Sequence, residues 1–190
     1  GENTPNFTAT YTGFKNGQDS AVIDSGSLSF TPADTSAYDA GSYVDEIQVS
    51  GDYADTNYDF VYDNADAGDL TVTKATVTIT PNNTSREYGE NTPNFTATYT
   101  GFKNGQDSAV IDAGSLSFTP ADTSSTDVGT YADTINVSGD YADTNYDFVY
   151  DNADAGDLTV TKAIVTITPD NASREYGENT PNYTATYTGF

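Results

Sequence analysis

The residues best suited to chemistry are carboxylates and amides gathered in two acidic turns of the same composition. They supply eight candidate cation ligands: Asp63, Asn64, Asp66 and Asp69, then Asp151, Asn152, Asp154 and Asp157. Calcium binds six to eight hard oxygen ligands, and turns add backbone carbonyls to the side chains. Because the spacing does not match an EF-hand loop, the alternative is a solvated acidic turn that keeps the surface soluble. Calcium is therefore the one cofactor that the sequence suggests.

A second candidate is a covalent cross-link between Lys74 and Asp45. Lys74 has the strand parity of the apolar residues before it, and Asp45 that of Tyr43 and Ile47, so both could point inward. A lysine buried beside a carboxyl group has a perturbed pKa and can condense with it into an isopeptide bond. The alternative, which we favour, is that Lys74 ends a strand and extends its ammonium group into water.

The composition argues against catalysis and against several classes of partner. The chain has no histidine, which removes the usual general base, and no cysteine, which removes disulfides and thiolate metal sites. With 6 basic and 29 acidic residues, the formal charge of −23 makes nucleic acid and anionic lipid poor partners. We see no apolar run long enough to insert into a membrane. We therefore expect a protein that is not an enzyme.

The elements that must position these residues are β-strands. Segments rich in Thr, Val, Ile, Tyr and Phe alternate with period two, and Gly, Pro, Asn and Asp cluster between them. Six or more short strands in under ninety residues indicate an all-β sandwich or Greek-key-like domain. In the best-defined part of the chain the predicted strands are 76–80, 94–100, 115–119, 130–138, 146–150 and 157–162.

The sequence repeats itself every 88 residues. The heptapeptide that starts at Gly1 returns at Gly89 and, with one change, at Gly177. Residues 1–88 and 89–176 align without gaps and differ at eleven positions. A unit of this length exceeds a solenoid repeat and is large enough to bury its own core. The period therefore predicts a tandem array of small domains.

Five of the eleven differences alternate along one predicted strand. They fall at positions 40, 42, 44, 46 and 48, whereas the odd-numbered residues between them are the same in both copies. Successive side chains of a strand point to opposite faces. We therefore expect Tyr43, Ile47 and Val49 to face the core and the varied positions to face water.

The pattern of apolar residues changes parity between two domains. Apolar residues lie at positions 70 and 72, then at 77 and 79, so the buried face switches across Lys74 and Ala75. This predicts boundaries at Lys74/Ala75 and Lys162/Ala163. Residues 1–74 would form a β domain without its opening strand, 75–162 a complete repeat, and 163–190 the opening strands of a third. Because no Gly, Ser or Pro linker intervenes, we expect a rod-like array.

Short motifs follow one another in a fixed order within the 88-residue unit. The opening strand is followed by Tyr88-Gly89-Glu90-Asn91-Thr92-Pro93, then by Gly129-Thr130-Tyr131 and the closing Leu158-Thr159-Val160-Thr161. In this order and spacing they resemble the MBG ("mostly beta, glycine-rich") repeats of large prokaryotic surface and adhesin-like proteins. The resemblance covers the whole 88-residue unit. It implies a small β domain used in tandem on the cell exterior, and it carries over no catalytic residue. Residues 132–134 lengthen the Gly-Thr-Tyr strand, which predicts a β-bulge there.

The sequence supports one function and leaves two alternatives open. We expect an extracellular, cell-surface stalk or fibre shaft whose partners are neighbouring repeats of the same chain. One alternative is a module that recognises a glycan or surface polymer through its many aromatic side chains. The other is a subunit that joins other copies head-to-tail, because residues 163–176 supply in type the strand that 1–74 lack. Since residues 177–190 duplicate 1–14, we favour a window of a continuous periodic chain.

Overall fold

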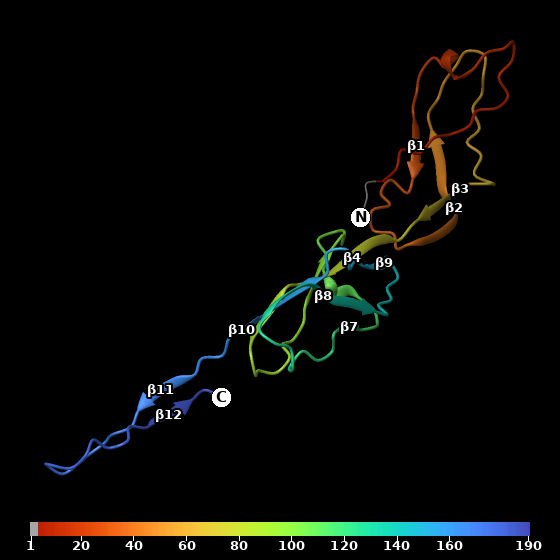
Figure 1. The fold of residues 1–190 in the computed structure, drawn as a ribbon. Coiled ribbons are helices and arrows are strands. Elements are labelled where there is room, and N and C mark those ends of the chain that lie inside the picture. Colours follow the sequence, from red (N-terminus) through yellow and green to blue (C-terminus); the bar gives the residue numbers. More distant parts are fainter. Residues whose placement is uncertain (1–3) are drawn as a thin grey trace. The chain divides into compact units, whose positions relative to one another are not determined.

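A computed structural model of the chain describes residues 4–190 and consists almost entirely of β-strands (Figure 1). Two 3-10 turns, η1 (Ser20–Val22) and η2 (Ser108–Val110), are its helical segments. The strands are β1 (Leu28–Thr31), β2 (Gly41–Gly51), β3 (Gly68–Val72), β4 (Ala75–Pro81), β5 (Thr84–Glu87), β6 (Ala97–Thr100), β7 (Leu116–Thr119), β8 (Gly129–Gly139), β9 (Tyr146–Tyr150), β10 (Gly156–Thr161), β11 (Thr166–Pro169) and β12 (Ala185–Thr188). Within the described residues, no helix is long and apolar enough to span a membrane. The all-β prediction is confirmed.

The chain forms two compact units that do not coincide with the sequence period. The first unit contains residues up to Val77 together with residues 101–112 and 142–147. The second contains residues 78–100, 113–141 and 148–190. Below, "first repeat", "second repeat" and "third repeat" denote residues 1–74, 75–162 and 163–190, and positions 88 apart are called counterparts. The repeat boundaries themselves stay a prediction.

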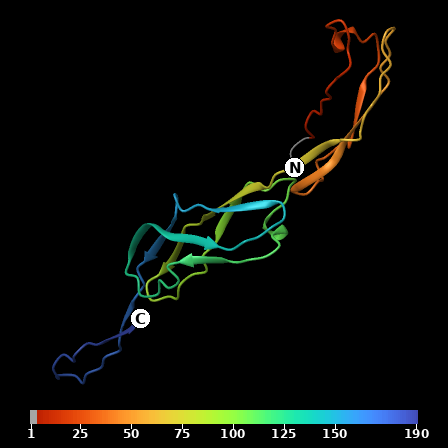
Figure 2. The same cartoon turned by 90° about the vertical axis from the view of Figure 1, so that its right-hand side faces the viewer.

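The second repeat contains two sheets. One has the strand order β5-β10-β8-β7 and the other β6-β4-β9. Along the sequence the chain passes from one sheet to the other after β4, β5, β6, β8 and β9, so each sheet is completed by strands distant in sequence. The strands of the four-stranded sheet, coloured yellow-green to light blue, lie side by side in both views (Figure 1, Figure 2).

The core of the second repeat is built from alternate residues of its strands. Ile135, Leu158 and Val160 form a buried cluster, against which Phe95, Phe118 and Tyr131 pack. Tyr131, Ile135 and the buried Val137 are the counterparts of Tyr43, Ile47 and Val49. The predicted inward face of this strand is therefore confirmed in the second repeat. In the first repeat the same three positions are half-buried.

The bulge predicted at residues 132–134 is confirmed. In the antiparallel pair of β8 and β10, Ile135 lies opposite Gly156 and Tyr131 lies opposite Leu158. A step of four residues along β8 therefore spans the same length of the pair as a step of two residues along β10. Asp133 takes a left-handed φ of 51°, and its backbone N–H donates to the Asp157 carboxylate at 3.0 Å. Asp and Asn adopt this conformation more readily than most residues, because their short side chains bond locally.

Among residues 4–74, the first repeat has a single sheet of three strands in the order β1-β2-β3. Its residues 9–12 and 58–62 are the counterparts of β6 and β9 and have the same sequences, yet they are not in strands. In the third repeat β11 pairs with β12, with Ile167 opposite Tyr187. This pair corresponds to β4 and β6 of the second repeat, where Ile79 lies opposite Tyr99.

Strand β5 was not predicted from the sequence. It pairs in parallel with β10, with Arg86 opposite Val160. Its residues are Thr-Ser-Arg-Glu, which show no alternation of apolar and polar side chains. Arg86 is nevertheless buried, and its guanidinium donates to the backbone oxygens of Glu87, Thr123 and Thr126. The arginine therefore holds the turn between β7 and β8 against β5.

Candidate functional site

A cluster of hydrogen-bonded polar groups joins the first repeat to the second, inside the first compact unit. Asn145 of the second repeat contacts the turn before β2: its amide nitrogen donates to Asp39 Oδ1 at 2.9 Å. Its amide oxygen accepts from the backbone N–H of Ala40 at 2.7 Å. We call these two hydrogen bonds the junction clamp. One side chain thus satisfies a carboxylate and a backbone donor of the preceding repeat.

Lys74 adds a second set of contacts at the same place. Its ammonium nitrogen donates to the backbone oxygen of Asp143 at 2.7 Å and lies 3.9 Å from the carboxylate of Asp147. The backbone N–H of Ala75 donates to the backbone oxygen of Asn145 at 2.9 Å. The Lys74 side chain is 41% exposed, which favours the strand-end alternative over a buried lysine paired with Asp45.

Local hydrogen bonds fix the loop that presents Asn145. The Asp143 carboxylate accepts from the backbone N–H groups of Asn145 at 2.6 Å and Tyr146 at 3.1 Å. Asp112 accepts from the backbone N–H of Thr144 at 3.1 Å and from its hydroxyl at 3.3 Å. Aspartate bonding of this kind to nearby N–H groups defines a turn without any regular secondary structure.

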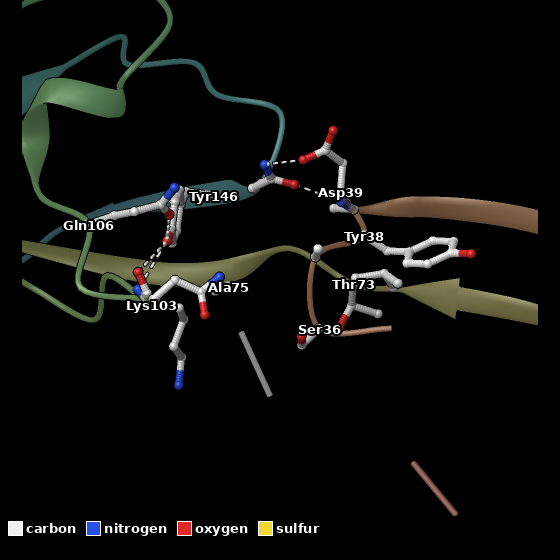
Figure 3. A pocket seen from close by; sticks show the side chains of 13 residues that line it. Ser36, Tyr38, Asp39, Thr73, Ala75, Lys103, Gln106 and Tyr146 are labelled. Atoms are coloured by element: carbon white, nitrogen blue, oxygen red, sulfur yellow. Dashed lines mark hydrogen bonds between the residues drawn. The ribbon is translucent and has the colours of Figure 1, made fainter. Parts of the chain in front are cut away.

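The buried side chain of Tyr146 anchors the loop that presents Asn145. Its side chain is only 4% exposed, and its hydroxyl accepts from the backbone N–H of Lys103 at 3.0 Å and donates to Gln106 Oε1 at 2.5 Å. The ring of Phe102 packs edge-on against it, with centroids 5.1 Å apart. Figure 3 shows Tyr146, Gln106 and Lys103 on one side of a small cavity and Tyr38 and Asp39 on the other. The groups around this cavity hold one another in place.

Two positions that differ between the repeats are hydrogen-bond partners in the first. The Tyr38 hydroxyl donates to the Glu46 carboxylate, and this hydrogen bond holds the pKa of Tyr38 above its ordinary value. In the second repeat both counterparts are threonine, Thr126 and Thr134. The two partners of this hydrogen bond thus both differ between the repeats. Asp39 between them is unchanged in its counterpart Asp127.

The eight predicted calcium ligands occupy the loops that precede β3 and β10 and the beginnings of those strands. The Asn64 side chain bonds both backbone groups of Val49 in β2: it accepts from Val49 N–H at 2.7 Å and donates to Val49 oxygen at 3.0 Å. Asn152 does the same for Val137, at 2.7 and 3.0 Å. Asp63, Asp69, Asp151 and Asp157 each accept from a backbone N–H, and none of the described hydrogen bonds involves the side chains of Asp66 or Asp154.

These side chains therefore have a structural use that does not depend on a cation. Within residues 4–190, no group of three or more acidic side chains converges in a way that could hold a metal ion. Asparagine and backbone oxygens could complete a calcium shell, so the calcium site stays a prediction. Calorimetric titration of the chain with calcium would test it.

The junction residues were not identified from the sequence as a site. A signal for them exists: Asp39 and its counterpart Asp127 are identical, although positions 37, 38 and 40 around them all differ. Asn145 and Lys74 likewise have identical counterparts, Asn57 and Lys162. Of positions 37 to 40, Asp39 is the one whose side chain bonds Asn145.

The sheets, the 88-residue period and the junction together define a protein made of small all-β domains joined in tandem. A family model described as MBG domain (YGX type) matches residues 1–71 and again residues 77–159. The chain therefore belongs to the MBG domain (YGX type) family, as the sequence motifs suggested. MBG domains are structural, non-enzymatic repeats that occur in surface proteins. No curated protein and no solved structure was found to match the chain.

Proposed function

We propose that the chain is a spacer segment in the stalk or fibre shaft of an extracellular, adhesin-like surface protein. Its work in this proposal is mechanical, because each repeat keeps its neighbour at a fixed distance and orientation. The observation that carries the proposal is the junction clamp, in which Asn145 bonds Asp39 and Ala40 of the preceding repeat. The family supports a role as a surface repeat.

The clamp is well suited to repetition. Asp39, Asn145 and Lys74 all have identical counterparts one period away, so each further junction of an array would carry the same set of groups. No flexible linker separates Lys74 from Ala75. Polar contacts that recur at each junction add stiffness without a large apolar surface that would associate with other proteins. The partners of a repeat in this proposal are its two neighbours.

The test compares Asn145→Ala with Asn57→Ala. Asn145 makes the clamp, whereas none of the described hydrogen bonds involves the side chain of its exposed counterpart Asn57. We expect Asn145→Ala to increase the interdomain flexibility seen by small-angle X-ray scattering and to speed hydrogen exchange at the Ala40 amide about tenfold, the effect of losing one hydrogen bond of about 1.4 kcal/mol.

The matched control should leave both readouts as in the wild-type chain. Circular dichroism should show that both variants keep their strand content. If Asn145→Ala leaves the scattering and the Ala40 exchange rate unchanged, the clamp does not stiffen the junction and the mechanical role loses its support.

A further inference from the structure

Two pairs of tyrosines hold their hydroxyl groups together, one pair in each of the first two repeats. In the second repeat the hydroxyl oxygens of Tyr99 and Tyr141 are 3.1 Å apart. Their counterparts in the first repeat, Tyr11 and Tyr53, make the same hydrogen bond at 3.1 Å. The ring centroids are 6.3 Å apart in both pairs, and the rings are inclined to each other by 31° and 30°. The same contact therefore forms twice within one chain.

Each pair bridges segments of its repeat that are distant in sequence. Tyr99 lies in β6, which belongs to the sheet β6-β4-β9, whereas Tyr141 follows β8 of the other sheet. The ring of Phe148 in β9 packs against Tyr141, with centroids 5.5 Å apart. In the first repeat Phe60 packs against Tyr53 at the same distance. The pair thus has equivalent surroundings in both repeats.

The composition makes tyrosine the residue of this chain that gives up an electron most easily. The chain has 15 tyrosines and no cysteine, methionine, tryptophan or histidine, the other side chains that oxidants attack most readily. A radical formed on the chain therefore has tyrosine as its most stable location. Since the chain cannot form a disulfide either, a covalent link made by oxidation has to use tyrosine.

The hydrogen bond within each pair also provides a route for the proton. Burial, followed by the hydrogen bond with Tyr141, raises the pKa of Tyr99. The hydrogen bond with Tyr11, followed by burial, raises the pKa of Tyr53. These phenols are therefore protonated at neutral pH, and each must lose a proton when it loses an electron. The hydrogen bond lets one hydroxyl pass its proton to the other, whose own proton goes to solvent.

The pairs are accessible to an oxidant in solution. Tyr11 is 38% exposed, and the other three tyrosines are half-buried. Partly exposed side chains change rotamer within nanoseconds, so the two rings of a pair can approach each other. The hydroxyl hydrogen bond keeps the ring carbons next to the two oxygens on the facing sides.

We propose that Tyr99 with Tyr141, and Tyr11 with Tyr53, are modification sites at which hydrogen peroxide, acting through a peroxidase, joins the two rings into dityrosine. Each phenol gives one electron and one proton to the oxidant, and one molecule of hydrogen peroxide takes up both pairs and becomes two molecules of water. The two radicals combine through a new bond between ring carbons ortho to the hydroxyls. The hydrogens on those carbons then move to the oxygens, which restores both hydroxyl groups.

The cross-link has a structural consequence. It fastens β6 to the segment after β8, and in each repeat it joins residues 42 positions apart. A covalent link of this kind restricts the unfolded chain, as a disulfide does. In a chain without cysteine, the tyrosine pair takes the place of the disulfide. This inference does not depend on the stalk function.

A third pair of tyrosines provides a matched control within the same chain. The rings of Tyr38 and Tyr43 are closer, with centroids 4.8 Å apart, but they meet edge-on at 81°. Their hydroxyls bond elsewhere, to the Glu46 carboxylate and to Asp39 oxygen. If proximity alone decided, this pair would couple first. If the shared hydroxyl hydrogen bond decides, the other two pairs couple and this one does not.

The first experiment treats a dilute solution of the 190-residue chain with a peroxidase and hydrogen peroxide. The monomer is separated from chains joined to one another, digested and examined by mass spectrometry. We expect two joined peptide pairs, one linking Tyr99 to Tyr141 and one linking Tyr11 to Tyr53, each lighter by two hydrogen atoms than its separate parts. An absence of dityrosine in the monomer, or coupling of Tyr38 to Tyr43 in the same yield, would overturn the proposal.

Phenylalanine variants assign the signal to the pairs. Tyr99→Phe and Tyr11→Phe keep the ring but remove the hydroxyl that is oxidised, so each should lose about half of the dityrosine fluorescence of the monomer. The double variant should lose nearly all of it, whereas Tyr43→Phe should keep the wild-type signal. Circular dichroism checks that the strands are retained. Wild-type fluorescence from the double variant would mean that other tyrosines couple and that the proposal is wrong.

The second experiment tests the structural consequence. Thermal unfolding of the purified cross-linked monomer should have a midpoint at least about 5 °C above that of the untreated chain, because the link restricts the unfolded state. The treated double variant Tyr11→Phe/Tyr99→Phe should show no such rise relative to the same variant before treatment. An unchanged midpoint in the cross-linked monomer would overturn the stabilising role of the link. None of these outcomes bears on the junction clamp.

Discussion

Residues 58–62 and 146–150 have the same sequence, Tyr-Asp-Phe-Val-Tyr, and different structures. The second segment is β9, whereas the first is not a strand. Val61 is 87% exposed and its counterpart Val149 is 48% exposed. The difference is the neighbour, because β9 shares a sheet with β4 and residues 58–62 have no such partner among the described residues. A short strand of this kind is therefore specified by its partner as much as by its own sequence.

The loops, in contrast to these segments, make the same hydrogen bonds in both repeats. Thr56 and Thr144 bond Asp24 and Asp112 with the same geometry in the two repeats, with backbone N–H distances of 3.1 Å in each case. The Asn64 and Asn152 side chains also make identical bonds to β2 and β8. These contacts join segments 15 to 32 residues apart within one repeat. They are the same in both repeats, although residues 58–62 are not a strand and β9 is.

The largest effect should follow from Ile79→Ala in β4. Ile79 is fully buried, so the substitution removes apolar contact and leaves a cavity, and should lower the free energy of unfolding by about 3 kcal/mol. Urea unfolding followed by tyrosine fluorescence measures the change. Its counterpart Ile167 is exposed, and Ile167→Ala should change the free energy of unfolding by less than about 0.5 kcal/mol. Similar losses would show that β11 is already covered.

A second effect should follow from Arg86→Met in β5. The substitution removes the guanidinium bonds to the backbone oxygens of Thr123 and Thr126, two groups of the turn before β8. We expect a loss of about 2 kcal/mol in the free energy of unfolding, since buried carbonyls then lose charged donors. The counterpart Arg174 is exposed and makes longer bonds of 3.3 Å, so Arg174→Met should have an effect within about 0.5 kcal/mol.

The sequence predicted the features that depend on side-chain alternation. Strands of the second repeat, the inward face of β8 and the bulge at Asp133 all follow from period-two patterning and from the alignment of the two repeats. Strand β5 could not be predicted in this way, because its position comes from pairing with β10, more than seventy residues later. The burial of Arg86 follows from the same pairing and contradicts the usual preference of arginine for the surface.

The junction residues were not predicted as a site. The parity switch at Lys74 and Ala75 predicts a domain boundary there, which stays a prediction. It could not identify Asn145, because contacts between segments about a hundred residues apart leave no periodic signal in one sequence. For the acidic turns, the sequence identified the oxygen-rich residues but not their hydrogen bonds to β2 and β8. Composition indicates which atoms are available, and only the fold shows what they already bind.

A third prediction concerns whether equivalent loop hydrogen bonds contribute the same free energy in the first and the second repeat. Asn152→Ala removes two hydrogen bonds to Val137 and should lower the free energy of unfolding by about 1 kcal/mol. Asn64→Ala removes two bonds of the same lengths to Val49 and should cost about the same. Urea unfolding of both variants provides the measurement. A clearly larger loss for Asn152→Ala would mean that the strands around a loop set the value of its bonds.

The smallest effect is a difference in acid sensitivity between two equivalent turns. Hydrogen bonds from Ser124 and Thr92, with a smaller contribution from the Arg86 charge, lower the pKa of Asp122 from 3.8 to about 2. Its counterpart Asp34 has a pKa lowered by bonds from Ser36 and Thr4, without an arginine among the causes. A carboxylate with a lowered pKa in the folded state stabilises the fold above pH 3.8, and that stabilisation is lost as the pH falls toward 2.

Asp122→Asn should therefore flatten the decline of the urea midpoint between about pH 4 and pH 2, and Asp34→Asn should flatten it less. The asparagine variants keep an oxygen that can accept the same hydrogen bonds, so they isolate the charge from the geometry. Unfolding curves at several pH values, with the wild-type chain as reference, give the slopes. Equal slopes for the two variants would mean that Arg86 acts on this turn only through its hydrogen bonds to Thr123 and Thr126, and that its charge does not reach Asp122 through the solvent.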